Sequence, residues 1–441
     1  MIQHIRDLPK LPEVGESANK ILAEISQLSV VVKREVSAKI RAKPDMFPAS
    51  LGLDIWRNVS ALNPNVGGVH YNSANLKRNS PWDAFRDLER QVIAWFSDLY
   101  CAERNQVFGY LTTGSSEGNL MGIWAARNAF RVRSPDQRIA LLFARNAHHS
   151  IHKAADILDF IAFETMPDAQ KTHHIVDLDA DYRMCTTALE TCIKFCVDSG
   201  ISQIVVVGSI GTTAVGALDP ISEISDVLGY FETTQGVQSH LHLDAAIGGL
   251  ITPFTTDNRQ MVTDFTKTPR IATITCDAHK LGALPYNAGV FLGRSKLLVS
   301  VERDANYTAS GVDATVTGSR SGAMSAALWG VMRSKGRLGM KKEIETTLHN
   351  ATIMRDLLNN HPVFDPVGRG DLNVVGAKLI ESLENNQQIQ SILLANGVFP
   401  DKIKRHENDC VSSIYPFYSM PDTNFDTVKT LLNQLRSLGG S

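Results

Sequence analysis

Short apolar runs alternate with longer segments of helical periodicity through the middle of this 441-residue chain. One segment, AFRDLERQVIAWFSDLY, repeats an apolar side chain every few residues from Phe85 to Leu99 and predicts an amphipathic helix. Alternation of strands and helices predicts βαβ units, and hence an α/β fold with a mostly parallel sheet and helices on both faces. The expected strands are Ile139–Ala144, Ile204–Val207, Leu241–Leu243, Ile271–Thr275 and Val290–Leu292, and the expected helices lie near residues 116–130, 149–159, 185–198 and 220–232.

The pattern changes after about residue 335, where strand-like runs become sparser. We therefore expect three parts: an N-terminal helical segment over residues 1–65, a large domain over residues 66–335, and a small C-terminal α/β domain over residues 336–441. Parallel α/β sheets bind ligands beyond the carboxyl ends of their strands. Residues with functional chemistry should therefore follow the expected strands.

Composition narrows the class of protein. The chain is 43% hydrophobic and 20% charged, with a formal net charge of −2, which is ordinary for a globular protein and gives no general attraction to nucleic acid or anionic membranes. No apolar stretch approaches the roughly 18 residues of a membrane helix, and the first residues lack a signal-peptide pattern. We expect a cytoplasmic enzyme. The six cysteines form no cluster at metal-ligand spacing, so no metal is expected.

A first candidate motif, YLTTGSSEGNL, covers residues 110–120 and reads as a strand end, a tight turn and a helix start. Gly114, Ser115 and Ser116 would supply backbone N–H groups, hydroxyls and the positive end of a helix, a combination that suits a phosphate. A serine at the start of a helix is also a common capping residue. The stretch alone therefore leaves both interpretations open.

Three further motifs follow expected strands. HLHLDAAIGG ends its strand with Asp244, where a charge must be paired or neutral because burying it alone costs several kcal/mol; a salt bridge or helix cap is an equal alternative. RNAHHSIHKAADIL opens a helix with His148 and His149, and such histidines are more often surface or capping residues. CDAHKLG places His279 beside Lys280.

Together these motifs contain the parts of a pyridoxal phosphate site. The phosphate needs an anchor, and the aldehyde needs a lysine amine. The pyridine nitrogen stays protonated when a buried carboxylate lies beside it. A cradle, a histidine, an aspartate and a lysine follow one another along the chain at residues 114–117, 148, 244 and 280.

The chain also resembles the group II pyridoxal-phosphate-dependent amino acid decarboxylases, and is most similar to the histidine, serine and tyrosine/aspartate decarboxylases. The resemblance covers roughly residues 60–340 and rests on FGYLTTGSSEGNLMGIWAAR, HHSIHKAADIL, GTTAVGALDPI, HLDAAIGG, DAHKLG and TGSRSG, in the family's order. It implies the aspartate aminotransferase-like fold (fold type I), which has a mostly parallel central sheet and a smaller C-terminal α/β domain.

The resemblance also implies roles for the central residues. Lys280 would bind the cofactor's aldehyde, and Asp244 would contact the pyridine nitrogen. The family places its ring-stacking histidine at the start of an H-x-S-[hydrophobic]-x-K-A stretch, and this frame selects His148 rather than His149. The other implied cofactor contacts are Gly114, Ser115, Ser116 and His279 at the phosphate, Ala246 beneath the ring, and Thr212 near the ring oxygen.

The implied activity is decarboxylation of a histidine, aromatic or acidic L-amino acid to CO₂ and an amine. The Gly/Ser/Thr-rich residues 306–322 are typical of a mobile loop. Within it, Tyr307 is the candidate proton donor, with packing within the loop as an equal alternative. Arg320 is expected either to steer a carboxylate or to form a structural ion pair.

Two other classes of function stay open at this point. One is a different pyridoxal phosphate reaction, that of an aminotransferase or of a carbon–carbon lyase resembling sphingosine-phosphate lyase; the other is a catalytically inactive binding scaffold. For partners, we expect a homodimer with active sites at its interface, since relatives share that arrangement and the N-terminal segment has an apolar face.

Overall fold

The fold is described from a computed structural model, which covers residue 60 and residues 83–134, 137–160, 173–255, 257–306 and 311–438. A seven-stranded sheet forms its centre, with strand order β1-β7-β6-β5-β4-β2-β3. Strands β3, β2, β4, β5 and β6 are mutually parallel, whereas β7 is antiparallel to both of its neighbours. The mostly parallel sheet confirms the expected fold class. The strands are β1 (Val107–Thr112), β2 (Ile139–Ala144), β3 (His173–Val176), β4 (Gln203–Ser209), β5 (Gln238–Asp244), β6 (Ile271–Asp277) and β7 (Gly289–Arg294).

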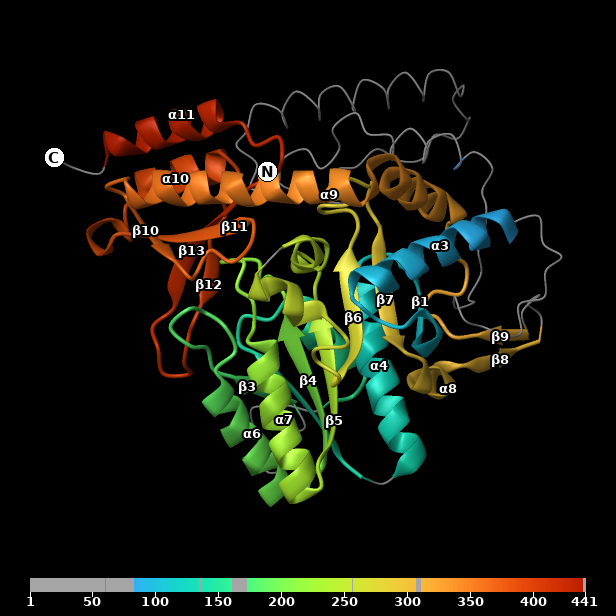
Figure 1. Ribbon diagram of the computed structural model, residues 1–441. Helices are drawn as coiled ribbons and strands as arrows, with labels where there is room; N and C mark the ends of the chain where they lie inside the picture. Colours follow the sequence, from blue (N-terminus) through green and yellow to red (C-terminus); the bar gives the residue numbers. More distant parts are fainter. Residues whose placement is uncertain are drawn as a thin grey trace, which may run out of the picture.

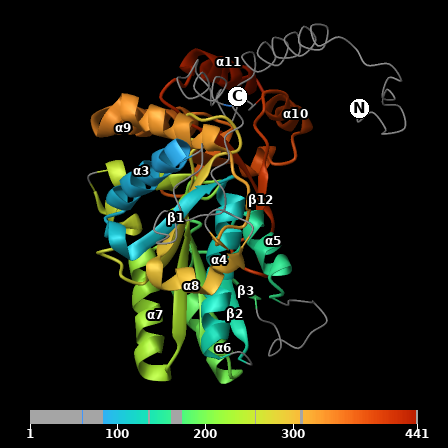
Figure 2. The same cartoon turned by 90° about the vertical axis from the view of Figure 1, so that its right-hand side faces the viewer.

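Helices cover both faces of this sheet (Figure 1). Successive side chains of a strand point to opposite faces, and β2 illustrates the result. Its residues Ala140 and Leu142 pack into the cluster that contains α6 and α7, whereas Leu141 and Phe143 pack into the cluster that contains α4 and α5. Figure 2 shows α7 and α5 on opposite sides of the sheet. The helices are α3 (Asp83–Leu99), α4 (Ser115–Arg133), α5 (His149–Ile157), α6 (Thr186–Asp198) and α7 (Ile221–Gln235).

The expected strands and helices are confirmed as β2 and β4 to β7, and as α3 to α7. Strand β3 was not expected. Its four residues, HHIV, begin with two histidines and lack an apolar run. The short β3 forms because it pairs in parallel with β2 at the edge of the sheet, a contact that local sequence does not indicate.

The C-terminal part has a second, antiparallel sheet of strand order β10-β11-β13-β12, with its own apolar core. The long helix α9 (Gly322–Asn359) leads into it, and its backbone leaves helical geometry at Gly336 (φ 60°, ψ 179°). This break lies at residue 336, where we expected the C-terminal domain to begin. The division into domains stays a prediction. The elements of this part are β10 (Phe364–Val367), β11 (Val374–Leu379), α10 (Gln387–Ala395), β12 (Asp401–Ile403), β13 (Ser412–Tyr418) and α11 (Phe425–Arg436).

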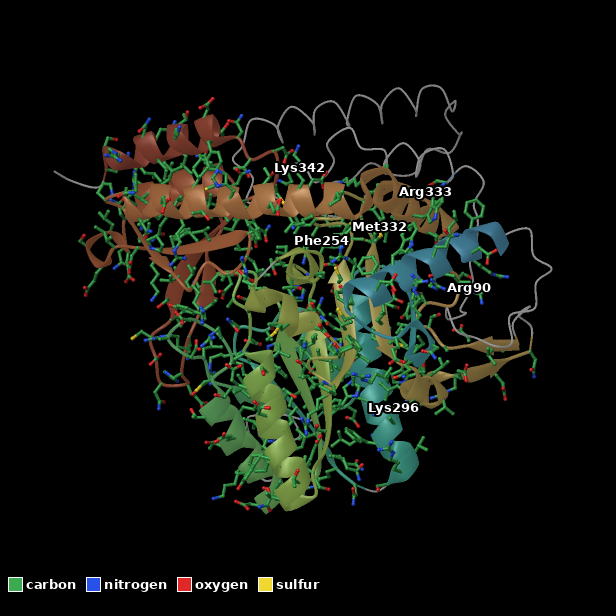
Figure 3. The ribbon with its side chains drawn as sticks, in the orientation of Figure 1. Arg90, Phe254, Lys296, Met332, Arg333 and Lys342 are labelled. Atoms are coloured by element: carbon green, nitrogen blue, oxygen red, sulfur yellow. The ribbon has the colours of Figure 1, made fainter. Side chains whose placement is uncertain are left out.

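Helix α9 runs above the ends of the central strands and packs beside α3 (Figure 3). Met332 of α9 and Phe254 below it are both buried in the main core cluster. The Trp329 indole Nε1 donates a hydrogen bond to Gln91 Oε1 of α3 at 3.0 Å. The remaining short elements are α8 (Leu298–Val301), β8 (Arg303–Ala305), β9 (Gly311–Asp313) and the 3₁₀ turns η2 (Arg104–Gln106), η4 (Gly248–Leu250), η5 (Thr252–Phe254), η6 (Asn258–Thr263), η7 (Ser295–Leu297) and η8 (Glu381–Leu383).

Two findings concern the described residues as a whole. None of their helices combines the length and the apolar character needed to cross a membrane. They also contain no group of three or more histidine, cysteine, aspartate or glutamate side chains placed to hold a metal ion. Most of the N-terminal segment 1–65, for which helices were expected, lies outside the described residues.

Candidate functional site

A cavity of about 280 Å³ opens at the edge of the central sheet where the parallel strands end. Its walls come from the segments that follow β1, β2, β4, β5 and β6, as expected for a ligand site of a parallel α/β sheet. Every residue that the resemblance implied for cofactor binding lines this one cavity. These residues are Gly114, Ser115, Ser116, His148, Thr212, Asp244, Ala246, His279 and Lys280.

The turn between β1 and α4 forms one wall. Gly114 adopts φ 129°, a backbone conformation that favours glycine, and a Cβ atom there would lie a tight 3.2 Å from Cε1 of His279. Helix α4 then begins at Ser115 and points its N-terminus into the cavity. The Ser115 N–H donates to Asp277, so the positive end of the helix and the hydroxyls of Ser115 and Ser116 form the part of this wall suited to an anion.

The Glu117 carboxylate, in the first turn of α4, contacts β1 and the turn that follows it. It accepts hydrogen bonds from the Thr113 N–H at 2.7 Å, the Thr113 hydroxyl at 2.8 Å and the Tyr110 hydroxyl at 3.0 Å. The residue is buried and does not line the cavity. These contacts stabilise the turn and keep a negative charge away from the space that an anion would occupy.

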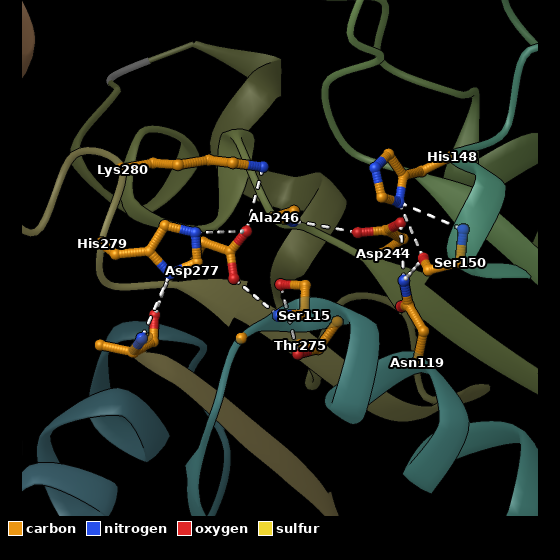
Figure 4. A network of polar contacts seen from close by, with 12 residues as sticks. Ser115, Asn119, His148, Ser150, Asp244, Ala246, Thr275, Asp277, His279 and Lys280 are labelled. Carbon is orange, nitrogen blue, oxygen red and sulfur yellow. Dashed lines mark hydrogen bonds and ion pairs between the residues drawn. The ribbon is translucent and has the colours of Figure 1, made fainter. Parts of the chain in front are cut away.

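Asp277 connects the lysine to the cradle (Figure 4). Its carboxylate accepts a hydrogen bond from the Ser115 N–H at 2.6 Å and lies 3.0 Å from the Lys280 amine. The Nε2 atom of His279 is 3.6 Å from the same carboxylate, and His279 Nδ1 contacts the Ala288 carbonyl at 2.7 Å. The carboxylate therefore orients both ionisable side chains of the CDAHKLG motif.

Asp244 ends β5 on the other side of the cavity (Figure 4). Its Oδ2 atom accepts a hydrogen bond from Asn119 Nδ2 at 2.9 Å, and its Oδ1 atom accepts one from the Ala246 N–H at 3.2 Å. Burial raises the pKa of Asp244, and the nearby Lys280 ammonium and these hydrogen bonds oppose the increase. A cationic ring nitrogen in the cavity would stabilise the ionised carboxylate further.

His148 caps the N-terminus of α5 and lines the cavity, whereas His149 beside it is exposed and does not. The Nδ1 atom of His148 accepts a hydrogen bond from the Ser150 N–H at 3.3 Å and lies 2.8 Å from the Ser150 hydroxyl. The two rings are 4.0 Å apart between centroids. Of the two histidines, the structure brings His148 to the cavity.

Thr212 and Ala246 complete the predicted set. The Thr212 hydroxyl oxygen accepts a hydrogen bond from the Ala217 N–H at 3.1 Å, which leaves the hydroxyl hydrogen to donate elsewhere. Ala246 follows Asp244 by two residues and presents a small side chain at the cavity wall. Their specific roles beside a bound ring stay predictions.

Behind Asp244, buried polar side chains continue inward through Asn119. Asn119 Oδ1 lies 2.9 Å from His242 Nε2; the Thr273 hydroxyl lies 2.8 Å from His242 Nδ1 and 3.0 Å from His240 Nε2. Burial lowers the pKa of His240 and that of His242 to about 3, so both imidazoles are neutral at pH 7.

These two histidines predict a loss of stability in acid. A histidine in the unfolded chain has a pKa near 6.5, so below pH 6.5 the unfolded chain binds protons that the native protein does not. The unfolding free energy therefore falls as pH decreases from 6.5 toward 3, by about 2 kcal/mol for each histidine between pH 7 and pH 5. His240→Gln should reduce this decrease by about 2 kcal/mol, measured by urea unfolding at both pH values. An unchanged decrease would mean that His240 titrates normally.

Arg320 forms a structural ion pair, which was one of its two expected roles. Its side chain is buried, contacts the Glu89 carboxylate of α3, donates a hydrogen bond to the Leu111 carbonyl at 3.2 Å and lies 5.0 Å from the Tyr110 ring centroid. It does not line the cavity. Glu89 also accepts a hydrogen bond from the Leu111 N–H at 2.8 Å, so the pair anchors α3 to β1.

Tyr307, the candidate proton donor, lies outside the described residues, together with residues 308–310. The described flanks of the expected 306–322 loop include β9, which pairs with β8, and the start of α9. The role of Tyr307 stays a prediction.

Sequence reasoning missed several residues of the site. Asp277 lies three residues before Lys280 in the same motif. This short spacing between an acidic and a basic residue could have indicated their contact. Asn119 follows the serine cradle along α4, and Ser150 follows His148 by two residues. Their contacts with Asp244 and His148 depend on how α4, α5 and β5 pack, which no local pattern indicates.

The donor set fits pyridoxal 5'-phosphate. The N-terminus of α4, widened by the missing side chain of Gly114, would hold the phosphate, together with the serine hydroxyls and His279. The buried Asp244 carboxylate would pair with the ring nitrogen. The Lys280 amine, which lines the same cavity, would hold the aldehyde.

Comparison with known proteins agrees with this fit. Residues 70–376 match the family model described as the pyridoxal-dependent decarboxylase conserved domain. A probable L-tyrosine/L-aspartate decarboxylase of Methanothermobacter thermautotrophicus is 32% identical over 259 residues, which are 58% of this chain and 63% of that relative. A tryptophan decarboxylase of Clostridium sporogenes is 28% identical over 298 residues, which are 66% of this chain and 65% of that relative. The matches thus span just under two thirds of these relatives.

Among solved structures, L-methionine decarboxylase from Streptomyces sp. 590 superposes with a TM-score of 0.79. The superposition covers 98% of each chain at 17% sequence identity. At this identity the similarity demonstrates the shared fold, which is the fold type I architecture expected from the motifs.

Proposed function

Because the chain belongs to the pyridoxal-dependent decarboxylase family, we propose that it is a pyridoxal-phosphate-dependent carboxy-lyase that converts an L-amino acid to CO₂ and the corresponding amine. The observation that carries this proposal is one cavity lined by a lysine, a buried aspartate, a histidine and the N-terminus of α4. The same arrangement argues against an inactive scaffold, since it keeps each group that the chemistry requires.

When bound, pyridoxal phosphate supplies an electron-accepting ring that stabilises the negative charge left at the substrate's α-carbon as CO₂ departs. Lys280 would anchor the cofactor and give way to the substrate amine, and Asp277, 3.0 Å from its Nζ atom, would orient it. Asp244 would hold a proton on the ring nitrogen, where its negative charge favours the protonated form. His148 would cover one face of the ring.

The substrate class is proposed from the names of relatives. One relative is described as a probable L-tyrosine/L-aspartate decarboxylase and another as a tryptophan decarboxylase. We therefore propose an aromatic or acidic L-amino acid, with histidine as a further candidate from the motif resemblance. The described cavity wall is polar around the position proposed for the cofactor.

The test is a screen of purified, cofactor-loaded enzyme against each proteinogenic L-amino acid, with CO₂ and amine measured together. We expect equal amounts of CO₂ and amine from at least one aromatic or acidic substrate. Formation of a keto acid or of an aldehyde fragment without CO₂ would instead assign a transamination or a carbon–carbon cleavage. Cofactor binding without any product would assign a binding scaffold.

Tyr307→Phe is predicted to lower the amine yield per CO₂ released. A phenol over the substrate's α-carbon would deliver the proton that replaces CO₂, and the change removes only the hydroxyl. We expect CO₂ release to continue while activity declines during turnover and recovers on addition of pyridoxal phosphate. One amine per CO₂ at the parent rate would identify Tyr307 as a packing residue.

We also propose a homodimer with active sites at its interface, in a cytoplasmic setting. Among the exposed apolar side chains of the described part, Leu338 of α9 is 83% exposed, a surface that a partner subunit could cover. Light scattering should give twice the monomer mass of 48.4 kDa. A fully active monomer would contradict this proposal.

A further inference from the structure

A continuous line of buried hydrogen bonds leads from the cavity into the protein. It runs from Asp244 to Asn119, then to His242, Thr273 and His240. Asn119, His242 and Thr273 are fully buried, and His240 is 4% exposed. Groups buried so deeply must satisfy one another, since water cannot reach them.

The chemistry of the groups fixes the direction of each hydrogen bond. An ionised Asp244 can only accept, so the Asn119 atom that faces it must be the NH₂ group. Asn119 Oδ1 then faces His242 Nε2 and must accept, so His242 carries its proton on Nε2. The neutral His242 accepts at Nδ1 from the Thr273 hydroxyl, which in turn accepts from His240.

A branch of the same line reaches the histidine in the cavity. The second N–H of Asn119 Nδ2 donates to the Ser150 hydroxyl at 2.9 Å. Ser150 then has its own hydroxyl hydrogen free to donate to His148 Nδ1, 2.8 Å away. One amide group therefore sets the acceptor orientation of Asp244 and the tautomer of His148 together (Figure 4).

Two glycines of α4 make this contact possible. A Cβ atom on Gly122 would lie 2.4 Å from His242 Nδ1, and one on Gly118 would lie 1.9 Å from the Thr275 hydroxyl oxygen. The helix therefore approaches β5 and β6 closely enough for Asn119, between these glycines, to reach strand side chains. Larger residues at either position would displace the amide from the line.

We propose that Asn119 and His242 are positioning residues for the cofactor: His242 orients the Asn119 amide, and this amide orients Asp244 toward the ring nitrogen and His148 toward the ring face. The proposal rests on the proposed function, because it assumes that a pyridine ring occupies the cavity. It assigns no proton transfer to either residue. Their role is to make Asp244 a fixed acceptor at one point of the cavity wall.

The test compares two cofactors in three proteins. One cofactor is pyridoxal phosphate, and the other is the 1-deaza analogue, which has carbon in place of the ring nitrogen. The proteins are the parent, His242→Leu, which removes the donor to Asn119, and His242→Gln, which keeps an amide N–H donor near the same point. Dissociation constants are measured by equilibrium dialysis of each full-length protein, and kcat and KM by CO₂ release.

We expect His242→Leu to weaken binding of pyridoxal phosphate about tenfold, the scale of a lost hydrogen bond to a charged group, and to weaken the deaza analogue several-fold less, because that analogue loses only the contribution of His148. The variant should lower kcat about tenfold or more, with KM for the amino acid nearly unchanged. His242→Gln should recover most of the loss. Equal weakening for both cofactors, or no weakening for either, would overturn the proposal.

A measurement on the parent protein tests the proposal even if His242→Leu misfolds. NMR of the histidine-labelled parent holoenzyme should show His242 as the neutral tautomer protonated at Nε2 at pH 7. A His242 protonated at Nδ1 could not donate to Asn119 and would refute the inference by itself. If the parent binds no pyridoxal phosphate, the proposed function fails; if it binds and turns over but the variants match it, only the positioning role fails.

Discussion

Replacement of Lys280 by alanine is expected to abolish amine formation, lowering kcat by roughly 10⁴-fold or more, the scale seen when a covalent catalytic group is removed. Lys280 is the only lysine among the residues that line the described cavity, so no second lysine amine is placed there to bind the aldehyde. The absorbance band of the lysine-bound cofactor should disappear with the activity. CO₂ release and the absorption spectrum measure the two losses independently.

Two matched variants separate the covalent role of Lys280 from its charge. Lys280→Arg keeps a cation beside Asp277, whose carboxylate lies 3.0 Å from the lysine amine, but a guanidinium cannot hold the aldehyde. It should therefore be as inactive as the alanine variant. Lys153→Ala, on the exposed side of α5, should stay within about twofold of the parent. A fully active Lys280→Ala would contradict the proposed function.

The sequence predicted the parts of the molecule that depend on local pattern. The strand QIVVVGS is buried along its whole length and was found from its apolar run, and the end of β5 at Asp244 followed from the same reasoning. Turn chemistry indicated Gly114, because its backbone conformation is one that glycine favours. The cavity then follows from topology, since parallel strands end at one edge.

The supporting contacts could not be predicted in this way. Asn119 lies 125 residues from Asp244 in the chain, and the hydrogen bond between them exists because α4 packs on β5 and β6. His242 faces α4 rather than solvent for the same reason. Arg320 could not be assigned from the sequence for the same reason. Its motif left a role in the site open, but its side chain packs against α3 and forms an ion pair with Glu89.

The choice between His148 and His149 shows what a family pattern adds. Local chemistry treats the two neighbours alike, as residues at a helix start. The H-x-S spacing selected His148, and the contact of its Nδ1 atom with Ser150 gives that spacing a physical reason. His148 caps the helix by accepting a hydrogen bond from the Ser150 N–H, and the Ser150 hydroxyl contacts the same ring nitrogen and holds the ring.

Asp244→Asn is expected to retain the cofactor but lower kcat about 10- to 10³-fold, since a neighbouring carboxylate shifts a pKa by about one to three units. Asparagine fills the same volume and can still accept a hydrogen bond from Asn119 or the Ala246 N–H. It carries no charge to hold a proton on the ring nitrogen, so the ring accepts electrons poorly. Cofactor content by absorbance and kcat by CO₂ release would separate binding from rate.

A stability measurement on the same variant tests whether Asp244 is only a structural cap. Burial raises the pKa of Asp244, so a neutral asparagine removes the cost of burying a carboxylate while giving up one of the two hydrogen bonds that the carboxylate accepts, and these two effects offset each other. We expect the thermal midpoint of cofactor-free Asp244→Asn to stay within a few degrees of the parent, whereas the stabilisation gained on adding pyridoxal phosphate should shrink. A large fall in the midpoint together with a near-parent kcat would identify Asp244 as a structural residue and would remove the ring-nitrogen contact from the proposed site.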